Sequence, residues 1–400
     1  MALPSWLTAC VNFFAGKASE KEVSVSEVSL APSVLAETPT QIELPVAISP
    51  IDQLEIVSPD SRLPEWFQGE IPTELLRLAR ANYEEPVYRQ ILADWVERYG
   101  GEEGRLLCSF FRRGPILRDD ASTWQTLSAC EARLVAPFSD LVLGIGDQLV
   151  LPLSETQSIT MGWVPPGQSW LCGGGGNEGF WPFTLKKGLW CAIFLITEEQ
   201  WQAVMGNNEY HYEDAKSAIG NNYFNEVQEF IQKLNATRSV DCFYYRLPTE
   251  DEWEYILRGG PISKNQSQYH FYFARSKTDL TPVASNDLSS SQANFNGSYP
   301  AGNGKVGPYV GFDTHVGNYF PNPLGMYDMH GYLWEWTATR KSSYNPVYGV
   351  TIAEGLDRVL CGGSNWIRGD ECRASHRGDF DTDYSPLDIG FRLVAVPFGE

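Results

Sequence analysis

Two carboxylates in the C-terminal half of the chain form its clearest metal-binding pattern. Asp328 and Glu335 lie seven residues apart in the segment YDMHGYLWEW. Gly331 and Leu333, which stand between them, can turn their main-chain carbonyls toward the same point. Calcium prefers such mixed sets of carboxylate and carbonyl oxygens. The segment therefore predicts a calcium site, although two carboxylates near a glycine are a common pattern.

Soft metal ligands are scattered along the chain. None of the eight cysteines forms a CxxC motif, which argues against a zinc ribbon. The five histidines form no HxH or His-x3-His pair, so they offer no substitute metal site. The run GGGG at 173–176 lacks a following Lys-Ser/Thr and is interpreted as a flexible turn, not a phosphate loop. The cysteines are Cys10, Cys108, Cys130, Cys172, Cys191, Cys242, Cys361 and Cys372, and the histidines are His211, His270, His315, His330 and His376.

Three helices that must position these residues are predicted from their first turns. Thr197 and Thr249 each precede a Gln or Glu at the third helical position, which is typical of a capping box. Asn225 stands in the same relation to Gln228, so it is predicted to cap the second helix. The strand-like FYYRL comes before the third helix. The final segment DIGFRLVAVPF alternates in a way that predicts a terminal strand with one buried face.

The N-terminal third has a different composition. Residues 1–17 are apolar and could dock on a membrane surface or on the main body. Residues 18–60 are rich in Ser, Glu, Pro and Val and contain no aromatic residue, which predicts a flexible linker. Residues 61–135 show helical spacing, and within them 73–113 resemble a short helical module found beside repeat and enzyme domains in some bacteria. Glycine and aromatic residues increase from about residue 145, so a second domain is expected over 145–400.

The overall charge limits the partners. A formal charge of −20 repels nucleic acid, and no Lys/Arg cluster offsets it. We expect no transmembrane segment, because no apolar run reaches 18 residues. The N-terminus lacks the basic region of a signal peptide, so a cytoplasmic location is expected.

Five segments, taken in order, resemble the formylglycine-generating-enzyme (sulfatase-modifying factor) domain over residues 180–396. They are FTLKKGLWCAIFLITEEQWQAVMGNN, YYRLPTEDEWEYILRGG, ANFNGS, NPLGMYDMHGYLWEWT, and RVLCGGSNWIRGDECRASHRG with IGFRLV. The resemblance implies an α+β fold similar to a C-type lectin, with a small sheet, long loops and little regular structure. Bidentate pairs between arginine and glutamate are expected to hold the loops. The residues concerned are Arg246, Arg258, Arg373, Arg377 and Arg392, with Glu250, Glu252, Glu254 and Glu335.

The resemblance also has implications for two metals, calcium and copper. Family calcium positions match the four residues of YDMHGYLWEW described above, and a second site matches Asn294 and Phe295 without a clear downstream aspartate. Active aerobic members hold copper with two cysteines, spaced Cys-x4-Cys after a GGS turn. Cys372 matches the second cysteine, whereas the first falls on Ile367, which cannot bind a metal. Copper(I) prefers two thiolates.

Because only one of the two family copper ligands is present, two classes of function stay open. We expect a non-catalytic member, or pseudo-enzyme, that binds a protein or small-molecule ligand. The alternative is a copper-dependent oxidase that converts a cysteine of a partner protein to formylglycine, as in sulfatase maturation; it requires a second thiol beside Cys372, such as Cys361. Oxidation of another substrate with a different metal also stays open. Ser364 and Trp334 match residues that line the active-site region of the family.

The segment after the GGS turn supplies the candidate binding residues. It is rich in Trp, Tyr, Arg and Asp, which are residue types that suit recognition. The same residues could also be a solvated loop network. The candidates are Trp366, Arg368, Asp370, His376, Asp379 and Tyr384.

Overall fold

The structure is a computed structural model of the whole chain, and it contains two compact units, Met1–Cys108 and Ser109–Glu400. The residues that it describes are 67, 70–81, 86–115, 125–171, 180–206, 216–237, 243–312, 314–340, 343–345, 350–352, 358–380 and 387–397. The predictions for the N-terminal apolar segment, for the linker, and for Tyr384 lie outside these ranges.

The first unit is built from helices, as its sequence predicts. Helix α2 spans Glu70–Ala81, α3 spans Pro86–Tyr99, and α4 spans Gly101–Arg113 and crosses the boundary into the second unit. The buried ring of Phe67 packs edge-on against Trp95, with 5.6 Å between the ring centroids. This contact gives the unit a small aromatic core.

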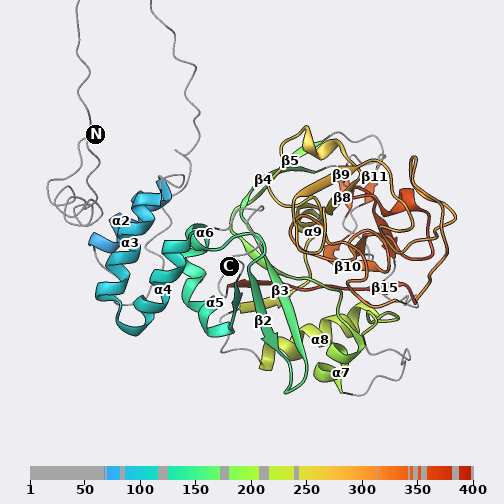
Figure 1. The fold of residues 1–400 in the computed structure, drawn as a ribbon. Helices are drawn as coiled ribbons and strands as arrows, with labels where there is room; N and C mark the ends of the chain where they lie inside the picture. The colour runs from blue at the N-terminus through green and yellow to red at the C-terminus, as the bar shows by residue number, and fades with distance from the viewer. Residues whose placement is uncertain are drawn as a thin grey trace, which may run out of the picture. The chain divides into compact units, whose positions relative to one another are not determined.

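The second unit contains a six-stranded sheet, and two further short helices lie between its first two strands in the chain. The sheet order is β1-β2-β3-β6-β16-β7, so the last strand of the chain lies between β6 and β7. Figure 1 shows the neighbouring strands β2 and β3 of this sheet side by side. Strand β1 lies within a region predicted to be helical; it pairs in parallel with β2. The helices are α5 (Ala129–Val135) and α6 (Ser139–Val142), and the strands are β1 (Thr126–Leu127), β2 (Gln148–Pro152), β3 (Ser158–Val164), β6 (Leu189–Ala192), β7 (Phe243–Arg246) and β16 (Val394–Pro397).

Three longer helices follow, and two of the three predicted caps are confirmed. Thr197 caps α7 (Glu198–Met205), and Thr249 caps α9 (Glu250–Leu257), each through a complete capping box. The prediction for Asn225 is wrong, because α8 spans Phe224–Thr237 and so starts before it. The Glu226 carboxylate accepts a hydrogen bond from the Tyr223 N–H at 2.8 Å, and this bond serves the start of α8 instead.

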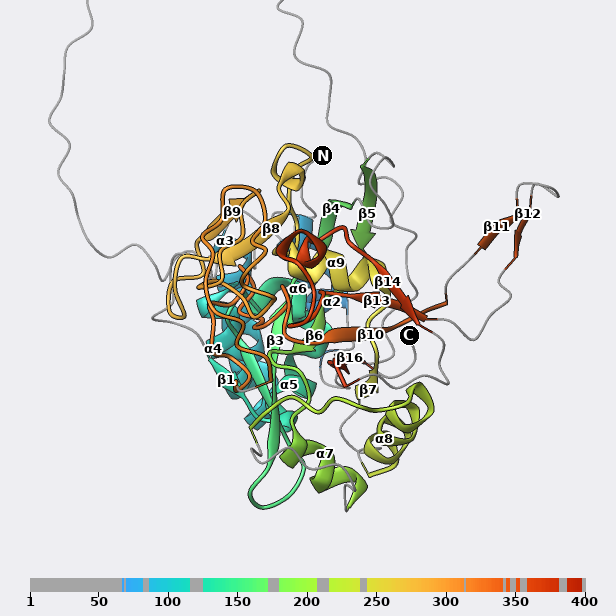
Figure 2. The same ribbon diagram turned by 90° about the vertical axis from the view of Figure 1, so that its right-hand side faces the viewer.

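A smaller four-stranded sheet carries three of the predicted site residues, Trp334, Glu335 and Asp379. Its order is β14-β13-β10-β15, and helix α9 packs against β10 and β13 (Figure 2). The two-stranded pairs β4–β5, β8–β9 and β11–β12 complete the unit, which confirms an α+β fold with long loops. The strands are β4 (Gly167–Leu171), β5 (Trp181–Leu185), β8 (Phe271–Ala274), β9 (Pro282–Ser285), β10 (Trp334–Arg340), β11 (Ser343–Asn345), β12 (Val350–Ile352), β13 (Arg358–Cys361), β14 (Gly378–Phe380) and β15 (Ile389–Gly390).

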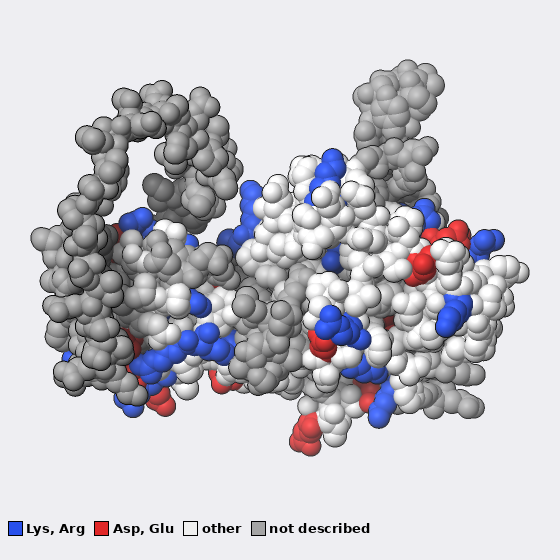
Figure 3. All heavy atoms as spheres, turned by 45° about the horizontal axis from the view of Figure 1, so that its top comes forward, with Lys and Arg blue, Asp and Glu red and all other residues white. Residues whose placement is uncertain are grey.

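Charged side chains are interspersed on the surface. On the face shown in Figure 3, Lys/Arg and Asp/Glu residues alternate with wide areas that carry neither. None of the helices among the described residues is long and apolar enough to cross a membrane.

Candidate functional site

The site forms where the loop before β10 meets the glycine turn after β13. Gly331 donates its N–H to the carbonyl of Gly362 at 2.8 Å, and Asn365 donates its N–H to the carbonyl of Tyr332 at 2.9 Å. Both Gly331 and Gly362 have positive φ values, 94° and 98°, which favour glycine. The two loops are therefore held together by main-chain hydrogen bonds, and their side chains face a common region.

The GGS turn brings the two family copper positions close together. A Cβ atom added to Gly363 would lie 2.8 Å from the sulfur of Cys372 and 2.8 Å from Cδ1 of Ile367. The thiol and the isoleucine methyl are therefore no farther apart than twice that distance. One copper position holds a sulfur, and the other holds a hydrocarbon.

Cys372 lies at the end of a short 3₁₀ turn, Gly369–Cys372, in an apolar environment. Its side chain is fully buried in a cluster with Phe271 and Phe295, and Ile367 packs against the same cluster. Burial raises the pKa of the thiol well above its ordinary value, and the nearby Glu371 carboxylate raises it further. Copper binds the thiolate, so this environment disfavours the ligand form of Cys372.

Cys361, the proposed substitute, belongs to a different buried cluster. It lies on β13 opposite Glu335 of β10 and packs with Trp253 and Met329. Burial raises the pKa of this thiol too. Among the described residues, no group of three or more His, Cys, Asp or Glu side chains could hold a metal ion. Because Ile367 occupies one of the two family cysteine positions and Cys361 belongs to another cluster, the residues present do not fit a copper centre of the family type.

Glu335 is committed to an ion pair. Its carboxylate accepts hydrogen bonds from Nε of Arg392 at 2.6 Å and from Nε1 of Trp253 at 2.8 Å, and its other oxygen accepts from Nη2 of Arg392 at 2.7 Å. Both Glu335 and Arg392 are fully buried. The predicted arginine pair is confirmed, and it neutralises the charge that Glu335 would offer to calcium.

Asp328 and Asn294 suit a cation better. Asp328 is buried, and one of its oxygens accepts the N–H of Gly317 at 2.6 Å. Burial raises the pKa of this carboxyl to about 6. Asn294 donates its amide to the carbonyl of Gly311 at 2.7 Å, whereas its buried Oδ1 has no partner among the described residues. Asp328 and Asn294 line the same small cavity, which therefore has both a carboxylate and an amide with an uncommitted oxygen among its lining residues.

The other predicted calcium positions lie nearby but contribute no side-chain oxygen. Gly331 and Leu333 belong to the loop that follows Asp328, and Leu333 is buried. Phe295 packs in the apolar cluster around Cys372. These three residues could supply only main-chain carbonyls.

Ser364 and Trp334 are both hydrogen-bonded to Asp388, a residue that the sequence analysis did not predict for the site. The hydroxyl of Ser364 donates to Oδ2 of Asp388 at 2.6 Å, and Trp334 donates its N–H to the carbonyl of Asp388 at 2.8 Å. Asp388 comes shortly before the IGFR segment, and only this position near a motif could have indicated it. The ring of Trp334 lies 5.7 Å from that of His376, which places this predicted binding residue in the same region.

The remaining binding candidates form an exposed surface. The side chain of Trp366 is 57% exposed and lies 6.2 Å from the ring of Tyr309. Arg368 pairs with Asp370 at 3.2 Å and lies over the ring of Tyr299 at 5.4 Å. The side chain of Asp379 is outside the described part of the structure.

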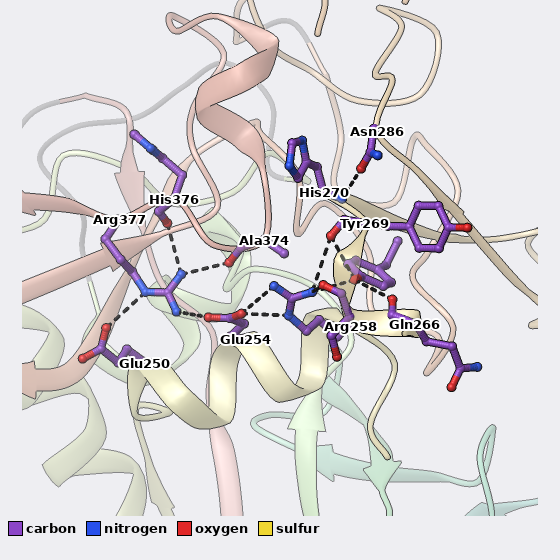
Figure 4. Close-up of polar contacts among 12 residues, drawn as sticks. Glu250, Glu254, Arg258, Gln266, Tyr269, His270, Asn286, Ala374, His376 and Arg377 are labelled. Carbon is purple, nitrogen blue, oxygen red and sulfur yellow. Dashed lines mark hydrogen bonds and ion pairs between the residues drawn. The ribbon is translucent and has the colours of Figure 1, made fainter. Parts of the chain in front are cut away.

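A chain of ion pairs links helix α9 to the residues just before β14 (Figure 4). Arg377 donates to Glu250 and Glu254 of α9, and Glu254 also accepts from Arg258 at 2.7 Å. Arg258 and Glu254 are both fully buried. Arg246 forms the predicted pair with Glu252 at 2.7 Å.

Arg373 differs from the other four motif arginines. It donates to the main-chain carbonyl of Asp370 at 2.7 Å, so it supports the short turn before Cys372.

Comparisons with known proteins agree with this architecture. The sequence profile of the "Sulfatase-modifying factor enzyme 1-like domain" matches residues 154–396. The chain is 30% identical to "Inactive C-alpha-formylglycine-generating enzyme 2" of Mus musculus over 38% of this chain and 42% of that protein. It is also 30% identical to "Formylglycine-generating enzyme" of Mycobacterium tuberculosis over 38% of this chain and 51% of that protein. The chain thus spans about half the length of these relatives.

A solved structure with a similar fold is also known. "Treponema denticola variable protein 1" matches 62% of this chain and 99% of its own chain at 21% identity, with a TM-score of 0.47.

Proposed function

The chain belongs to the sulfatase-modifying factor enzyme 1-like family, and we propose that it is a binding protein without formylglycine-forming activity. The observation that carries this proposal is the Ile367 side chain, which stands beside Cys372 where a second thiolate would be needed. The relatives include proteins named as active and as inactive enzymes, so family membership alone favours neither function.

The chemistry of the site supports a non-catalytic role. Copper(I) requires soft ligands, and one thiolate holds it weakly. The Cys372 thiol is buried among apolar side chains that favour its protonated form. Cys361 lies in another cluster beside Trp253 and does not compensate. A function in binding needs only the scaffold and an exposed surface, and function depends on the site and not on the fold.

The exposed surface supplies the binding face. Trp366 and Tyr309 present large aromatic areas to solvent, and such residues are enriched at recognition sites. The ion pairs of Arg377 with Glu250 and Glu254 hold the residues just before β14 against helix α9. We propose that this face binds a segment of a partner protein.

A direct assay separates binding from catalysis. The full chain is co-expressed with a sulfatase-type cysteine peptide under copper supply, and the peptide is examined by mass spectrometry for aldehyde formation. An active formylglycine-generating enzyme serves as the positive control. We expect no aldehyde from this chain. Aldehyde that disappears in Cys372→Ala would overturn the proposal and establish the copper-dependent oxidase.

Calcium is proposed as a structural ion of the cavity shared by Asp328 and Asn294. The carboxylate of Asp328 and the unpartnered Oδ1 of Asn294 would hold it, with main-chain carbonyls completing the set. The ion would balance the charge of the buried carboxylate, and it would tie the loop before β10 to the segment that carries Asn294.

A further inference from the structure

The carboxylate of Asp388 stands at the edge of the site with one known hydrogen-bond donor. Its side chain is half-buried, and its Oδ2 accepts the hydroxyl of Ser364 at 2.6 Å. The main-chain carbonyl of Asp388 accepts the N–H of Trp334 at 2.8 Å, which fixes the residue beside the first residue of β10. The carboxylate is therefore held in a defined place next to solvent.

Two exposed aromatic residues lie near this carboxylate and are linked to it through Ser364 and through its charge. Trp366 donates its N–H to the hydroxyl of Ser364 at 3.3 Å, and its ring lies 6.2 Å from that of Tyr309. The side chains of Trp366 and Tyr309 are 57% and 46% exposed. Partial burial raises the pKa of Tyr309, and the charge of Asp388 raises it further, so this carboxylate lies within electrostatic reach of the ring. The four residues thus form a closed cluster, in which each is close to the next.

The cluster has an unbalanced negative charge. Within the described part of the chain, no ion pair includes Asp388. The cation on the neighbouring segment, Arg368, is engaged with Asp370 at 3.2 Å and with the ring of Tyr299 at 5.4 Å. A carboxylate near exposed aromatic rings attracts a cation with an apolar stem, because the charge pairs with the cation while the rings contact the stem.

We propose that the carboxylate–aromatic cluster of Ser364, Tyr309, Trp366 and Asp388 binds a lysine or arginine side chain of a partner protein. The inference rests on the proposed binding function and names the chemistry of its partner. The ammonium or guanidinium group pairs with Asp388, and the stem or guanidinium plane lies on the rings. The formal charge of −20 also speeds the association of a basic partner.

The test uses two small probes of nearly equal shape. N-acetyl-arginine methylamide carries the positive charge, whereas N-acetyl-citrulline methylamide does not. Each is titrated at constant ionic strength into the full chain, and the indole N–H resonance of Trp366, assigned with Trp366→Phe, is followed by NMR. We expect arginine to shift this resonance saturably, with citrulline binding at least about tenfold more weakly.

A matched pair of variants separates this site from general attraction to an acidic protein. Asp388→Asn removes the charge of the cluster and keeps an acceptor for Ser364, and it should weaken arginine binding about tenfold. Glu229→Gln removes an exposed charge that is paired with Lys233 on helix α8, outside the binding face, and should leave the affinity unchanged. Equal losses in the two variants, equal binding of citrulline, or an unmoved Trp366 resonance would each refute the inference. The aldehyde assay contains no free arginine probe, so failure of the proposed function is seen separately.

Discussion

Ile367 decides the copper chemistry at the scale of single residues. Its Cδ1 methyl group and the Cys372 sulfur each lie 2.8 Å from the position that a Cβ atom on Gly363 would take. Ile367→Cys should therefore place two thiols close together and create a copper(I) site. We expect one tightly held copper ion after anaerobic loading and dialysis, measured by elemental analysis. Ile367→Ser, which adds a polar atom without sulfur, should hold none; copper retention equal to that of the serine variant would contradict the geometry.

His330 gives a second prediction, for stability against pH. Its ring is buried between the carbonyl of Cys372 and the N–H of Tyr272, which are 2.7 and 3.0 Å away. Burial lowers the pKa of His330 to about 4. The unfolded chain therefore takes up a proton below about pH 6.5 that the folded chain refuses, so stability falls as the pH drops toward 4.

The measurement compares His330→Gln with the wild type by urea unfolding at pH 7.5 and pH 5. Glutamine keeps a donor and an acceptor but does not titrate. We expect the wild type to lose about 2 kcal/mol more than the variant between these conditions. A chelator is present throughout, so that metal binding does not contribute. Parallel losses would show that His330 is protonated in the folded state.

Asp328 carries the calcium prediction. Chelation should lower the melting temperature of the wild type, because calcium at about 100 times its Kd stabilises a protein by about 2.7 kcal/mol. Asp328→Asn keeps an acceptor for the Gly317 N–H but removes the charge, and its melting temperature should not respond to the chelator. Asp370→Asn, on the exposed surface, should respond like the wild type. If chelation does not change the melting temperature of the wild type, the proposal of a bound calcium ion is refuted.

Helix α9 is the element on which the site rests. Its Glu254 joins two buried or nearly buried arginines, Arg258 and Arg377, so Glu254→Gln should leave both without their shared charge partner. We expect a loss of about 3–5 kcal/mol, measured by urea unfolding. Glu229→Gln breaks an exposed pair with Lys233 on α8 and should change little. Glu250→Gln removes a partly exposed partner of Arg377, so its loss of stability should lie between those of the other two variants. It provides the measurement if Glu254→Gln does not fold.

The helices also show which elements can be predicted from the sequence. The capping boxes at Thr197 and Thr249 are local, so residue spacing was sufficient to find both helices. The start of α8 was missed because a glutamate reaching back to the Tyr223 N–H can replace a side-chain cap at Asn225. Asp388 was missed because its partners come from β10 and from the GGS turn, which are distant in the chain.

At the scale of the whole molecule, the motifs identified the family domain, but residue numbers alone could not locate the thiols. Cys361 and Cys372 are eleven residues apart, and an intervening turn places them in separate apolar clusters. The predicted arginine–glutamate pairs were confirmed for Arg246, Arg258 and Arg377, because opposite charges in a buried loop region must be paired.

The position of β16 has a consequence for biosynthesis. Residues 394–397 supply an interior strand that is hydrogen-bonded to β6 on one side and to β7 on the other. Until the ribosome has translated β16, strands β6 and β7 lack the strand that pairs with both of them. The larger sheet can therefore close only after synthesis has passed residue 397 and that stretch has cleared the exit tunnel, so a nascent chain halted earlier would expose two open strand edges to chaperones.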